Sequence, residues 1–163
     1  MKERMIDFYM RIARETAKLS RARRLQVGCV IVKDDNIISF GWNGTPPGWD
    51  NDCEYKDYCI SRDFTGNYFP GTENEYPFED EYGRYKLKTK PEVLHAEANA
   101  LLKLCRTHES SSAASLFLTH APCIECAKLI FSSGIKNVFY NEVYRNTDGI
   151  NFLNNTDIKV LKI

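Results

Sequence analysis

The sequence predicts an α/β protein, a three-layer α/β/α sandwich built around a central mixed sheet of five strands. Three observations predict this fold. An amphipathic helix opens the chain, five short runs with strand character follow it, and two segments with helical periodicity separate the later runs. The resulting order, β-β-α-β-α-β-β, makes the later strands parallel, because helices cross over between them and cover both faces of the sheet.

The first predicted helix covers about residues 3–19. The residues of its buried face recur at three- and four-residue steps: Met5, Phe8, Tyr9, Ile12, Ala13, Thr16 and Leu19. The predicted strands are residues 27–32, 37–42, 116–119, 137–140 and 158–163, and the later helices are residues 96–105 and 124–133. A turn at residues 34–36 joins the first two strands into a hairpin, and Gly134 ends the last helix as a C-cap. Residues 141–155 are expected to form a connector with one helical turn.

Residues 49–91 have no sustained periodicity and are rich in Asp, Glu, Asn, Gly and Tyr. A loop of this length inside a compact domain is functional or partly disordered. Its many aromatic residues argue against disorder, because they can bury surface. We therefore expect a single domain over residues 1–163 with a long irregular insert at about 49–91, which packs on its own domain or on a neighbouring subunit.

Composition excludes several classes of protein. The 163 residues are 43% hydrophobic and 27% charged, as in one globular domain. The net charge is zero, so nothing drives the chain toward nucleic acid or an anionic membrane. The charge is uneven, with nine Lys/Arg and three acids in residues 1–33, and ten acids and two bases in residues 50–82. This pattern is either a solvated face beside an acidic loop, or a place where Arg21, Arg23 and Arg24 meet a phosphate.

No apolar run approaches the roughly 20 residues that a membrane span needs, and we see no signal peptide. Six cysteines could form a disulfide framework in a small secreted protein. Here two of them form C-x-x-C, and a histidine elsewhere can join them, so metal binding in a reducing compartment is the better interpretation. We expect a cytoplasmic protein, either of a cell or of an infected host cell.

His95-Ala96-Glu97 and the run P-C-I-E-C at residues 122–126 carry the chemistry. One histidine and two cysteines (His95, Cys123 and Cys126) supply three ligands to zinc and leave a fourth position open, as in catalytic zinc sites. Glu97 is placed to move protons beside a metal-bound water. The alternatives are a closed zinc knuckle with a fourth ligand from elsewhere, and core thiols beside an unrelated histidine. The other two histidines are weaker ligand candidates: His108 lies in a polar stretch and is expected to be exposed, and His120, at a strand end three residues before Cys123, could line the pocket.

Both halves of this motif precede predicted helices. His95 comes directly before one helix and Cys123 directly before the next. The positive end of a helix macrodipole favours thiolate over thiol and stabilises a metal-bound hydroxide. Pro122 suits the approach to a helix, because it fixes φ and lacks a donor. The three ligands converge if both helices pack against the same edge of the sheet.

Four runs carry a resemblance to a known family: V-G-C-V-I-V (27–32), G-W-N-G-T-P (41–46), H-A-E-A-N-A-L (95–101) and P-C-I-E-C-A-K (122–128). With these runs the chain resembles the cytidine/deoxycytidylate deaminase superfamily, and within it the deoxycytidylate (dCMP) deaminases. The resemblance implies a cytidine-deaminase-like fold and one catalytic Zn²⁺. It also implies hydrolysis of dCMP to dUMP and ammonia, which supplies dUMP for thymidylate synthesis. Glu97 would be both the acid and the base.

The resemblance also implies roles for single residues. His95, Cys123 and Cys126 are the zinc ligands, and Glu97 is the proton shuttle. Val27 and Ala96 hold the base, Asn43 lies near the sugar or a regulatory nucleotide, and Tyr144 packs on the base. From sequence alone Tyr144 is equally a half-exposed tyrosine at a strand end. We add Arg21, Arg23 and Arg24 as phosphate candidates, because they come just before Val27 at the mouth of the expected pocket.

Enzymes of this family are typically homohexamers, activated by dCTP with Mg²⁺ and inhibited by dTTP. The resemblance places such control at Trp42, Asn43, Gly44 and Arg106, although Arg106 could simply be a cation that favours a helix C-terminus. Several members carry a second zinc site in their insert. Here Cys53 and Cys59 have no histidine beside them in residues 50–91, so a second structural zinc is doubtful and buried free thiols are the simpler interpretation.

Three other functions remain open. A tRNA adenosine deaminase shares two of the motifs, but it needs a concentrated cationic surface that this neutral chain lacks. A free-nucleoside cytidine deaminase would differ in its independence of phosphate, and the choice between dCMP and dCTP is open too. A noncatalytic zinc-stabilised interaction module would have no use for Glu97. The expected partners are therefore a small deoxynucleotide and further copies of the chain, with no nucleic acid and no membrane.

Overall fold

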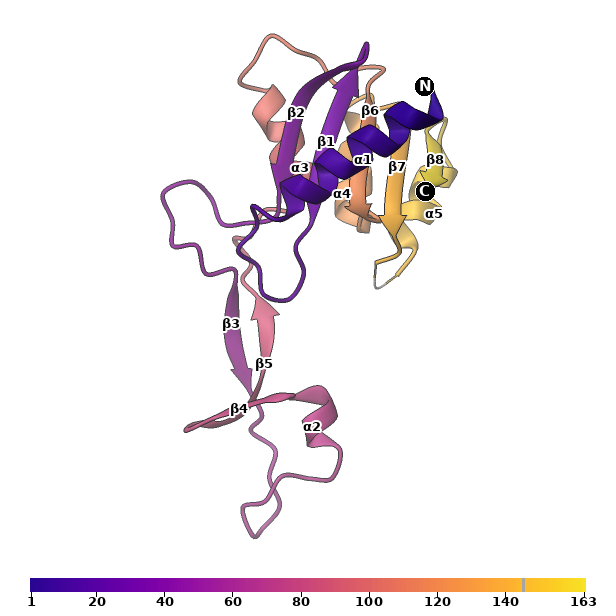
Figure 1. The fold of residues 1–163 in the computed structure, drawn as a ribbon. Helices are drawn as coiled ribbons and strands as arrows, with labels where there is room; N and C mark the ends of the chain where they lie inside the picture. The colour runs from indigo at the N-terminus through magenta and orange to yellow at the C-terminus, as the bar shows by residue number, and fades with distance from the viewer. Residues whose placement is uncertain (145) are drawn as a thin grey trace.

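The main sheet has the strand order β2-β1-β6-β7-β8 (Figure 1). Its strands are β1 (Gly28–Lys33), β2 (Asn36–Trp42), β6 (Ser115–His120), β7 (Asn137–Glu142) and β8 (Lys159–Lys162). β1 pairs antiparallel with β2 and with β6, whereas β6 with β7 and β7 with β8 are parallel. This computed structural model describes residues 1–144 and 146–163. The prediction of a mixed five-stranded sheet is confirmed.

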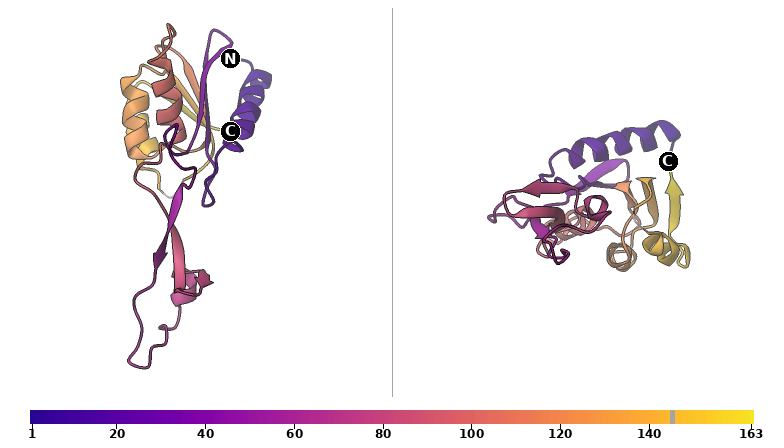
Figure 2. Two further views of the ribbon diagram at one scale, coloured as in Figure 1. Left: turned by 90° about the vertical axis from the view of Figure 1, so that its left-hand side faces the viewer. Right: turned by 90° about the horizontal axis from the view of Figure 1, so that it is seen from below.

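Helices cover both faces of the sheet, as predicted (Figure 2). Helix α1 (Glu3–Ala17) crosses one face, and α3 (Ala96–Leu104), α4 (Ile124–Ser132) and α5 (Asp148–Asn154) cover the other. The boundaries of the predicted helices and strands lie within two residues of the observed ones. The connector differs, because α5 has seven residues where a single turn was expected. Its Ile150 and Leu153 are buried, so packing stabilises a helix that local sequence signals only weakly.

The alternation of side chains along β1 explains its continuous apolar sequence. Cys29 and Ile31 belong to the core between the sheet and α3, whereas Val30 and Val32 belong to the core beneath α1. A strand that is covered on both faces has no solvent side and therefore no polar alternation. The hairpin to β2 is closed by Asp34 and Asp35, whose φ angles of 49° and 60° fit a two-residue turn of the mirror-image type.

Two glycines let helices touch the backbone of the sheet. A Cβ atom at Gly28 would lie 2.0 Å from the Ala13 carbonyl oxygen of α1. One at Gly41 would lie 2.5 Å from the Ala96 carbonyl oxygen and 2.5 Å from the Ala100 nitrogen of α3. Because Ala96 is the first residue of α3, the contact at Gly41 determines how closely the start of this helix approaches β2.

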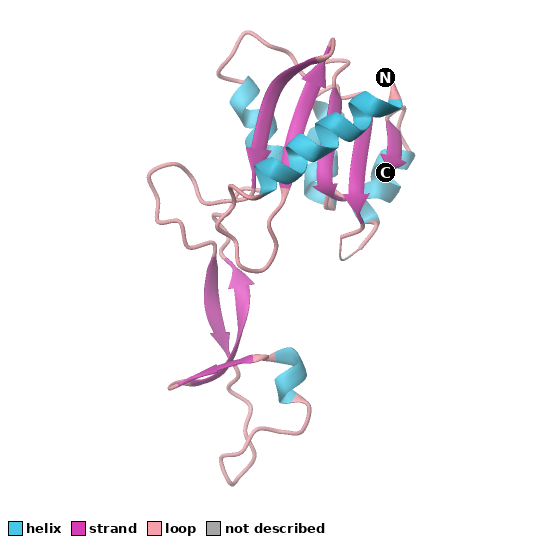
Figure 3. Cartoon of the chain, in the orientation of Figure 1, coloured by secondary structure: helices cyan, strands magenta, loops and turns pink. Residues whose placement is uncertain are grey.

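The insert contains regular structure, so the prediction that residues 49–91 are irregular is wrong in part. Strands β3 (Glu54–Tyr58), β4 (Phe78–Asp80) and β5 (Gly83–Thr89) form a second sheet in the order β3-β5-β4, joined by the short helix α2 (Thr72–Glu75). Residues 54–89, called the arm below, project from one end of the sandwich (Figures 1 and 3). Residues 84–89 do alternate charged and less polar side chains, but turn residues on either side obscure this period of two.

None of the helices in the described ranges combines the length and the apolar composition that a membrane span requires.

Filling the contact at Gly41 should destabilise the fold. In Gly41→Ala the new methyl group meets the backbone of α3, and we expect the free energy of unfolding to fall by about 1–3 kcal/mol or more. Urea denaturation measures this change. Gly44→Ala is the matched control, because its Cβ would have 3.7 Å to the nearest atom. Equal stability of the two variants would show that the close approach at Gly41 is unimportant.

Candidate active site

A cavity of about 480 Å³ opens at the edge of the main sheet where β2, β6 and β7 end and β1 begins. Its wall is formed by residues that follow or precede these strands, by the first residues of α3, and by the root of the arm, which is the pair Glu54 and Thr89. The lining residues are Arg24, Leu25, Val27, Asn43, Glu54, Thr89, Val93, His95, Ala96, Glu97, His120, Ala121, Cys123, Glu142, Val143 and Tyr144.

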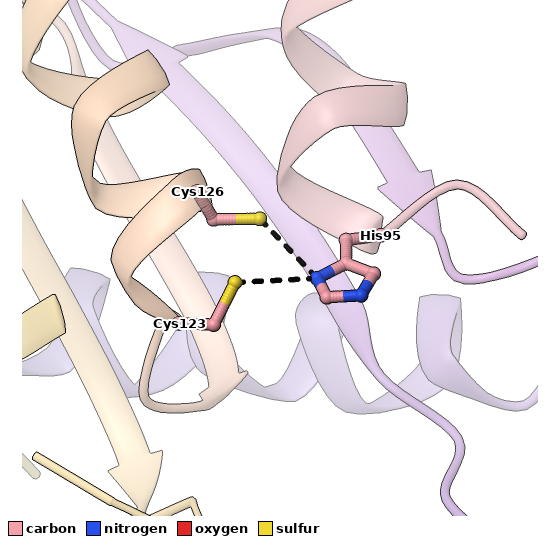
Figure 4. Close-up of side chains that lie close together, drawn as sticks. All are labelled: His95, Cys123 and Cys126. Atoms are coloured by element: carbon pink, nitrogen blue, oxygen red, sulfur yellow. Dashed lines mark hydrogen bonds between the residues drawn. The ribbon is translucent and has the colours of Figure 1, made fainter. Parts of the chain in front are cut away.

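Three of the predicted zinc ligands meet at this edge. His95 is the N-cap residue of α3 and Cys123 that of α4, and neither side chain caps its helix. Their side chains and that of Cys126 point toward one another instead (Figure 4). The Nδ1 atom of His95 lies 3.5 Å from the Cys123 sulfur and 3.4 Å from the Cys126 sulfur. The two helix N-termini therefore converge as the sequence predicts.

The spacing of these atoms suits zinc. Zinc–nitrogen bonds of about 2.0–2.1 Å and zinc–sulfur bonds of about 2.3 Å, at tetrahedral angles, place nitrogen and sulfur about 3.5 Å apart. The observed nitrogen–sulfur distances are 3.4 and 3.5 Å, and all three ligand atoms lie within 4.8 Å of one another. Over residues 1–144 and 146–163 this is the one group of His, Cys and acidic side chains with such spacing. The set would supply three ligands to a zinc ion and would leave a fourth position open.

The ligand side chains share protons in a way that a cation would change. The pKa of Cys123 is lowered to about 3, mainly by a hydrogen bond from Cys126 and next by the contact with His95. The same hydrogen bond is the main cause that raises the pKa of Cys126, and burial is the second. The contact with Cys123 raises the pKa of His95. A zinc ion binds deprotonated ligands, so it would displace the shared protons and bind more weakly in acid.

Glu97 lies beside this group in the first turn of α3 and lines the cavity. It is 4% exposed, and burial raises the pKa of its carboxyl group above the ordinary value. A carboxyl group with a raised pKa both accepts and returns protons closer to neutral pH than an exposed one does. The geometry thus places a proton carrier next to the candidate metal ligands.

The turn after β2 holds two walls of the site in place. The side chain of Asn43 accepts a hydrogen bond from the Val27 nitrogen and donates one to the Leu25 oxygen, each at 2.8 Å. The Gly44 backbone pairs with Leu94, through nitrogen–oxygen distances of 3.1 and 2.9 Å. Leu94 directly precedes His95, so this turn positions both the loop before β1 and a candidate ligand.

The remaining predicted residues divide into two groups. Val27, Asn43, Ala96, Tyr144 and Arg24 line the cavity, where a substrate could reach them.

Arg21 and Arg23 are exposed and lie outside the cavity lining. Trp42 also lies outside it, with its ring stacked near Phe40 and the Lys103 ammonium 4.5 Å from its centroid. Arg106 is exposed just beyond the end of α3.

Several lining residues were not anticipated as part of the site. Glu54 and Thr89 come from the root of the arm, where the lack of an obvious strand pattern concealed them. His120 differs from these two, because its place at the end of a strand marks it as a residue that could line the pocket, and it does. Its Nε2 atom lies 3.4 Å from Glu142 and its Nδ1 atom lies 3.0 Å from Thr119.

The cysteines of the insert do not meet. Cys53 precedes β3 and Cys59 follows it, and both are buried free thiols. This is the arrangement that the absence of a neighbouring histidine favoured.

Comparison with known proteins agrees with this geometry. The family described as the cytidine and deoxycytidylate deaminase zinc-binding region matches residues 3–142. The chain is 31% identical to the deoxycytidylate deaminase of Enterobacteria phage T4, over 94% of this chain and 87% of that protein. It is also 31% identical to that of Pongo abelii, over 87% of this chain and 67% of that protein. The crystal structure of dCMP deaminase from cyanophage S-TIM5, in complex with dCMP and dUMP, is similar with a TM-score of 0.78 and 35% identity, over 100% of this chain and 99% of that one.

Replacing one thiol should remove the metal. In Cys126→Ser the third ligand becomes a hydroxyl group, and we expect zinc to fall from about one ion per chain to a small fraction of that value. Elemental analysis of the dialysed protein measures the ratio. Cys105→Ser is the control, because Cys105 is exposed and distant from the ligand group in the fold. Equal zinc in both variants would contradict the assignment of Cys126.

Proposed function

The chain belongs to the cytidine and deoxycytidylate deaminase family, and from that premise we propose that it hydrolyses dCMP to dUMP and ammonia. As a deaminase it is a hydrolase. The observation that carries the proposal is the placing of buried Glu97 next to His95, Cys123 and Cys126 within one cavity. A zinc module with a purely structural role would have no reason to bury a carboxyl group there.

The residues of the site supply each proton transfer that the reaction needs. His95, Cys123 and Cys126 would hold a zinc ion, which would lower the pKa of a water molecule toward about 7 so that it can lose a proton near neutral pH. Glu97 accepts a proton from the attacking water and delivers it to the ring nitrogen next to the amine-bearing carbon. The water oxygen bonds to that carbon. Glu97 then carries the second proton of this oxygen to the amine, the carbon–nitrogen bond breaks, and ammonia leaves.

The cavity supports a mononucleotide as substrate. Its volume, about 480 Å³, is in the range of small-molecule sites. Val27 and Ala96 form apolar walls near the ligand group, where a pyrimidine ring would lie. Arg24 lies in the same wall as the root of the arm and offers a cation to the phosphate. This arrangement favours a nucleotide over a free nucleoside.

We also propose that the protein is a homo-oligomer, with a hexamer as the expected form. The arm exposes Ile60, Phe64 and Tyr82 at 93%, 101% and 73%, which is typical of a surface that meets another chain. The zero net charge of the chain gives no reason to expect a nucleic acid there. All six cysteines are free, which supports a reducing compartment and hence the cytoplasm.

Regulation by dCTP with Mg²⁺ and by dTTP is proposed at the turn after β2 and at Arg106. Asn99 of α3 donates a hydrogen bond to the Trp42 carbonyl oxygen, and Gly44 pairs with Leu94 next to His95. A nucleotide that contacts this turn would therefore act on the start of α3 through these two sets of hydrogen bonds. They give Trp42, Asn43 and Gly44 a short path to the catalytic group.

The function is tested by ammonia release. With dCMP as substrate, Glu97→Gln should lower kcat by about 10²–10⁴-fold, because Gln cannot carry a proton. Its zinc content and thermal unfolding should stay those of the wild type. Glu125→Gln is the control, since Glu125 is an exposed residue of the same motif that pairs with Lys128.

The wild type should prefer dCMP in a series that also contains cytidine, deoxycytidine, CMP, dCTP and an adenosine-bearing tRNA. Undiminished activity of Glu97→Gln would refute the mechanism, and preference for the tRNA would refute the substrate class.

Assembly and regulation can be measured on one preparation. Light scattering should give the mass of a homo-oligomer, with six chains as the expected value. At dCMP concentrations below KM, dCTP with Mg²⁺ should raise the rate and dTTP should lower it. A monomeric mass would refute the assembly, and a flat response to both triphosphates would refute the regulation.

A further inference from the structure

Glu54 is a buried carboxylate of the cavity wall that the deamination steps do not use. It is the first residue of β3 and is 3% exposed. Its Oε1 atom accepts hydrogen bonds from the backbone nitrogens of Arg23 and Arg24, each at 3.1 Å. Its Oε2 atom lies 3.2 Å from the Arg23 nitrogen and 3.9 Å from the Arg23 Nε atom. A buried carboxylate requires such donors, so these bonds hold the loop at Arg23 and Arg24 against the arm.

Thr89 holds the other end of the same arginine. The Nη1 atom of Arg24 donates a hydrogen bond to the Thr89 Oγ1 atom at 2.9 Å. Thr89 is the residue paired with Glu54 in the β3–β5 ladder. One cross-strand pair of the arm, Glu54 with Thr89, therefore holds Arg24 at two points. Glu54 binds its backbone nitrogen, and Thr89 binds its guanidinium.

The guanidinium of Arg24 is held without being neutralised. In the part of the chain that the structure describes, Arg24 forms no ion pair with an acidic side chain, whereas Arg23 lies within 4 Å of Glu54. A guanidinium has five N–H donors, and the bond to Thr89 occupies one of them. Arg24 also lines the cavity, which Arg21 and Arg23 do not. It is thus an oriented cation at the wall of the pocket.

We propose that Glu54 is a positioning residue for phosphate recognition: it fixes the backbone of Arg24, so that the Arg24 guanidinium meets the phosphate of the nucleotide. The proposal rests on the proposed function, because it takes a nucleotide as substrate. It makes the Glu54–Thr89 pair of the arm a part of the substrate pocket. The negative charge of Glu54 does not oppose the phosphate directly, because two amides and the Arg23 guanidinium face it.

The test compares ligands with and without a phosphate. In Glu54→Ala the Arg24 backbone loses its acceptor, and we expect KM for dCMP and Ki for dUMP to rise about 10- to 100-fold, as for loss of a charged hydrogen bond. The kcat for dCMP, the Ki for deoxyuridine and the zinc content should stay within about twofold. Glu54→Gln keeps one acceptor oxygen and should restore most of the affinity. Thr89→Val, which removes only the side-chain acceptor, should raise KM for dCMP by several-fold.

A double-mutant cycle then separates positioning from general destabilisation. If Glu54 acts through Arg24, the double variant Glu54→Ala, Arg24→Gln should have the same KM for dCMP as Arg24→Gln alone. Arg11→Gln is the control and should match the wild type, because Arg11 is an exposed residue of α1 that pairs with Asp7. If Glu54→Ala fails to fold, Thr89→Val takes its place in the cycle with Arg24→Gln, because Thr89 accepts the hydrogen bond from the Arg24 guanidinium.

Three outcomes overturn the inference: unchanged KM for dCMP, equal losses of affinity for dUMP and deoxyuridine, or additive effects in the cycle. Failure of the wild type with bound zinc to release ammonia from dCMP would overturn the proposed function, and this inference with it. Normal dCMP kinetics in Glu54→Ala would overturn the inference alone.

Discussion

The direction in which β2, β6 and β7 run determines where the chemistry can occur. β1 is antiparallel to both of its neighbours, so β2 and β6 are parallel, and β7 and β8 continue in the same direction. Each of these strands except β8 leads into a helix that returns across one face, which gives three successive crossovers through α3, α4 and α5. The helices must therefore begin at one edge of the sheet. This is the edge at which open α/β sheets bind ligands, and His95 and Cys123 stand there because each begins a crossover helix.

Parallel strands bring the helix N-termini to one edge, but glycines determine how closely they approach. Gly41 lets the backbone of α3 lie against β2 at Ala96, one residue after His95. Gly149 does the same for α5, where an added Cβ would lie 2.1 Å from the Pro122 oxygen and 2.8 Å from the Cys123 oxygen. Both segments that carry candidate ligands therefore contact the backbone of a neighbouring element directly, and backbone atoms move less easily than a side chain. Distances near 3.5 Å between ligand atoms depend on this support.

The sequence was most informative where local patterns and the core agree. Apolar periodicity predicted α1, β1 and α4 because each buries one stripe or both faces in the same core. The meeting of His95, Cys123, Cys126 and Glu97 was predictable because short motifs placed these residues next to helix starts. The arm was not predicted, because its strands bury few residues and its stability comes from pairs such as Phe78 with Tyr85. Glu54 had no local signal, since its role depends on a hydrogen bond across 30 residues.

The arm joins an exposed apolar surface to a part of the cavity wall. Its far end exposes Ile60 and Phe64, whereas its root supplies Glu54 and Thr89 to the cavity wall. Both ends belong to one insert, whose β3–β5 ladder runs without interruption from Glu54 paired with Thr89 to Tyr58 paired with Tyr85. If copies of the chain associate through the arm, their contact acts on the β3–β5 ladder, and the first pair of this ladder orients Arg24. Thermodynamic linkage then requires reciprocity: assembly that favours this orientation strengthens binding of a phosphate, and a bound nucleotide strengthens assembly by the same free energy.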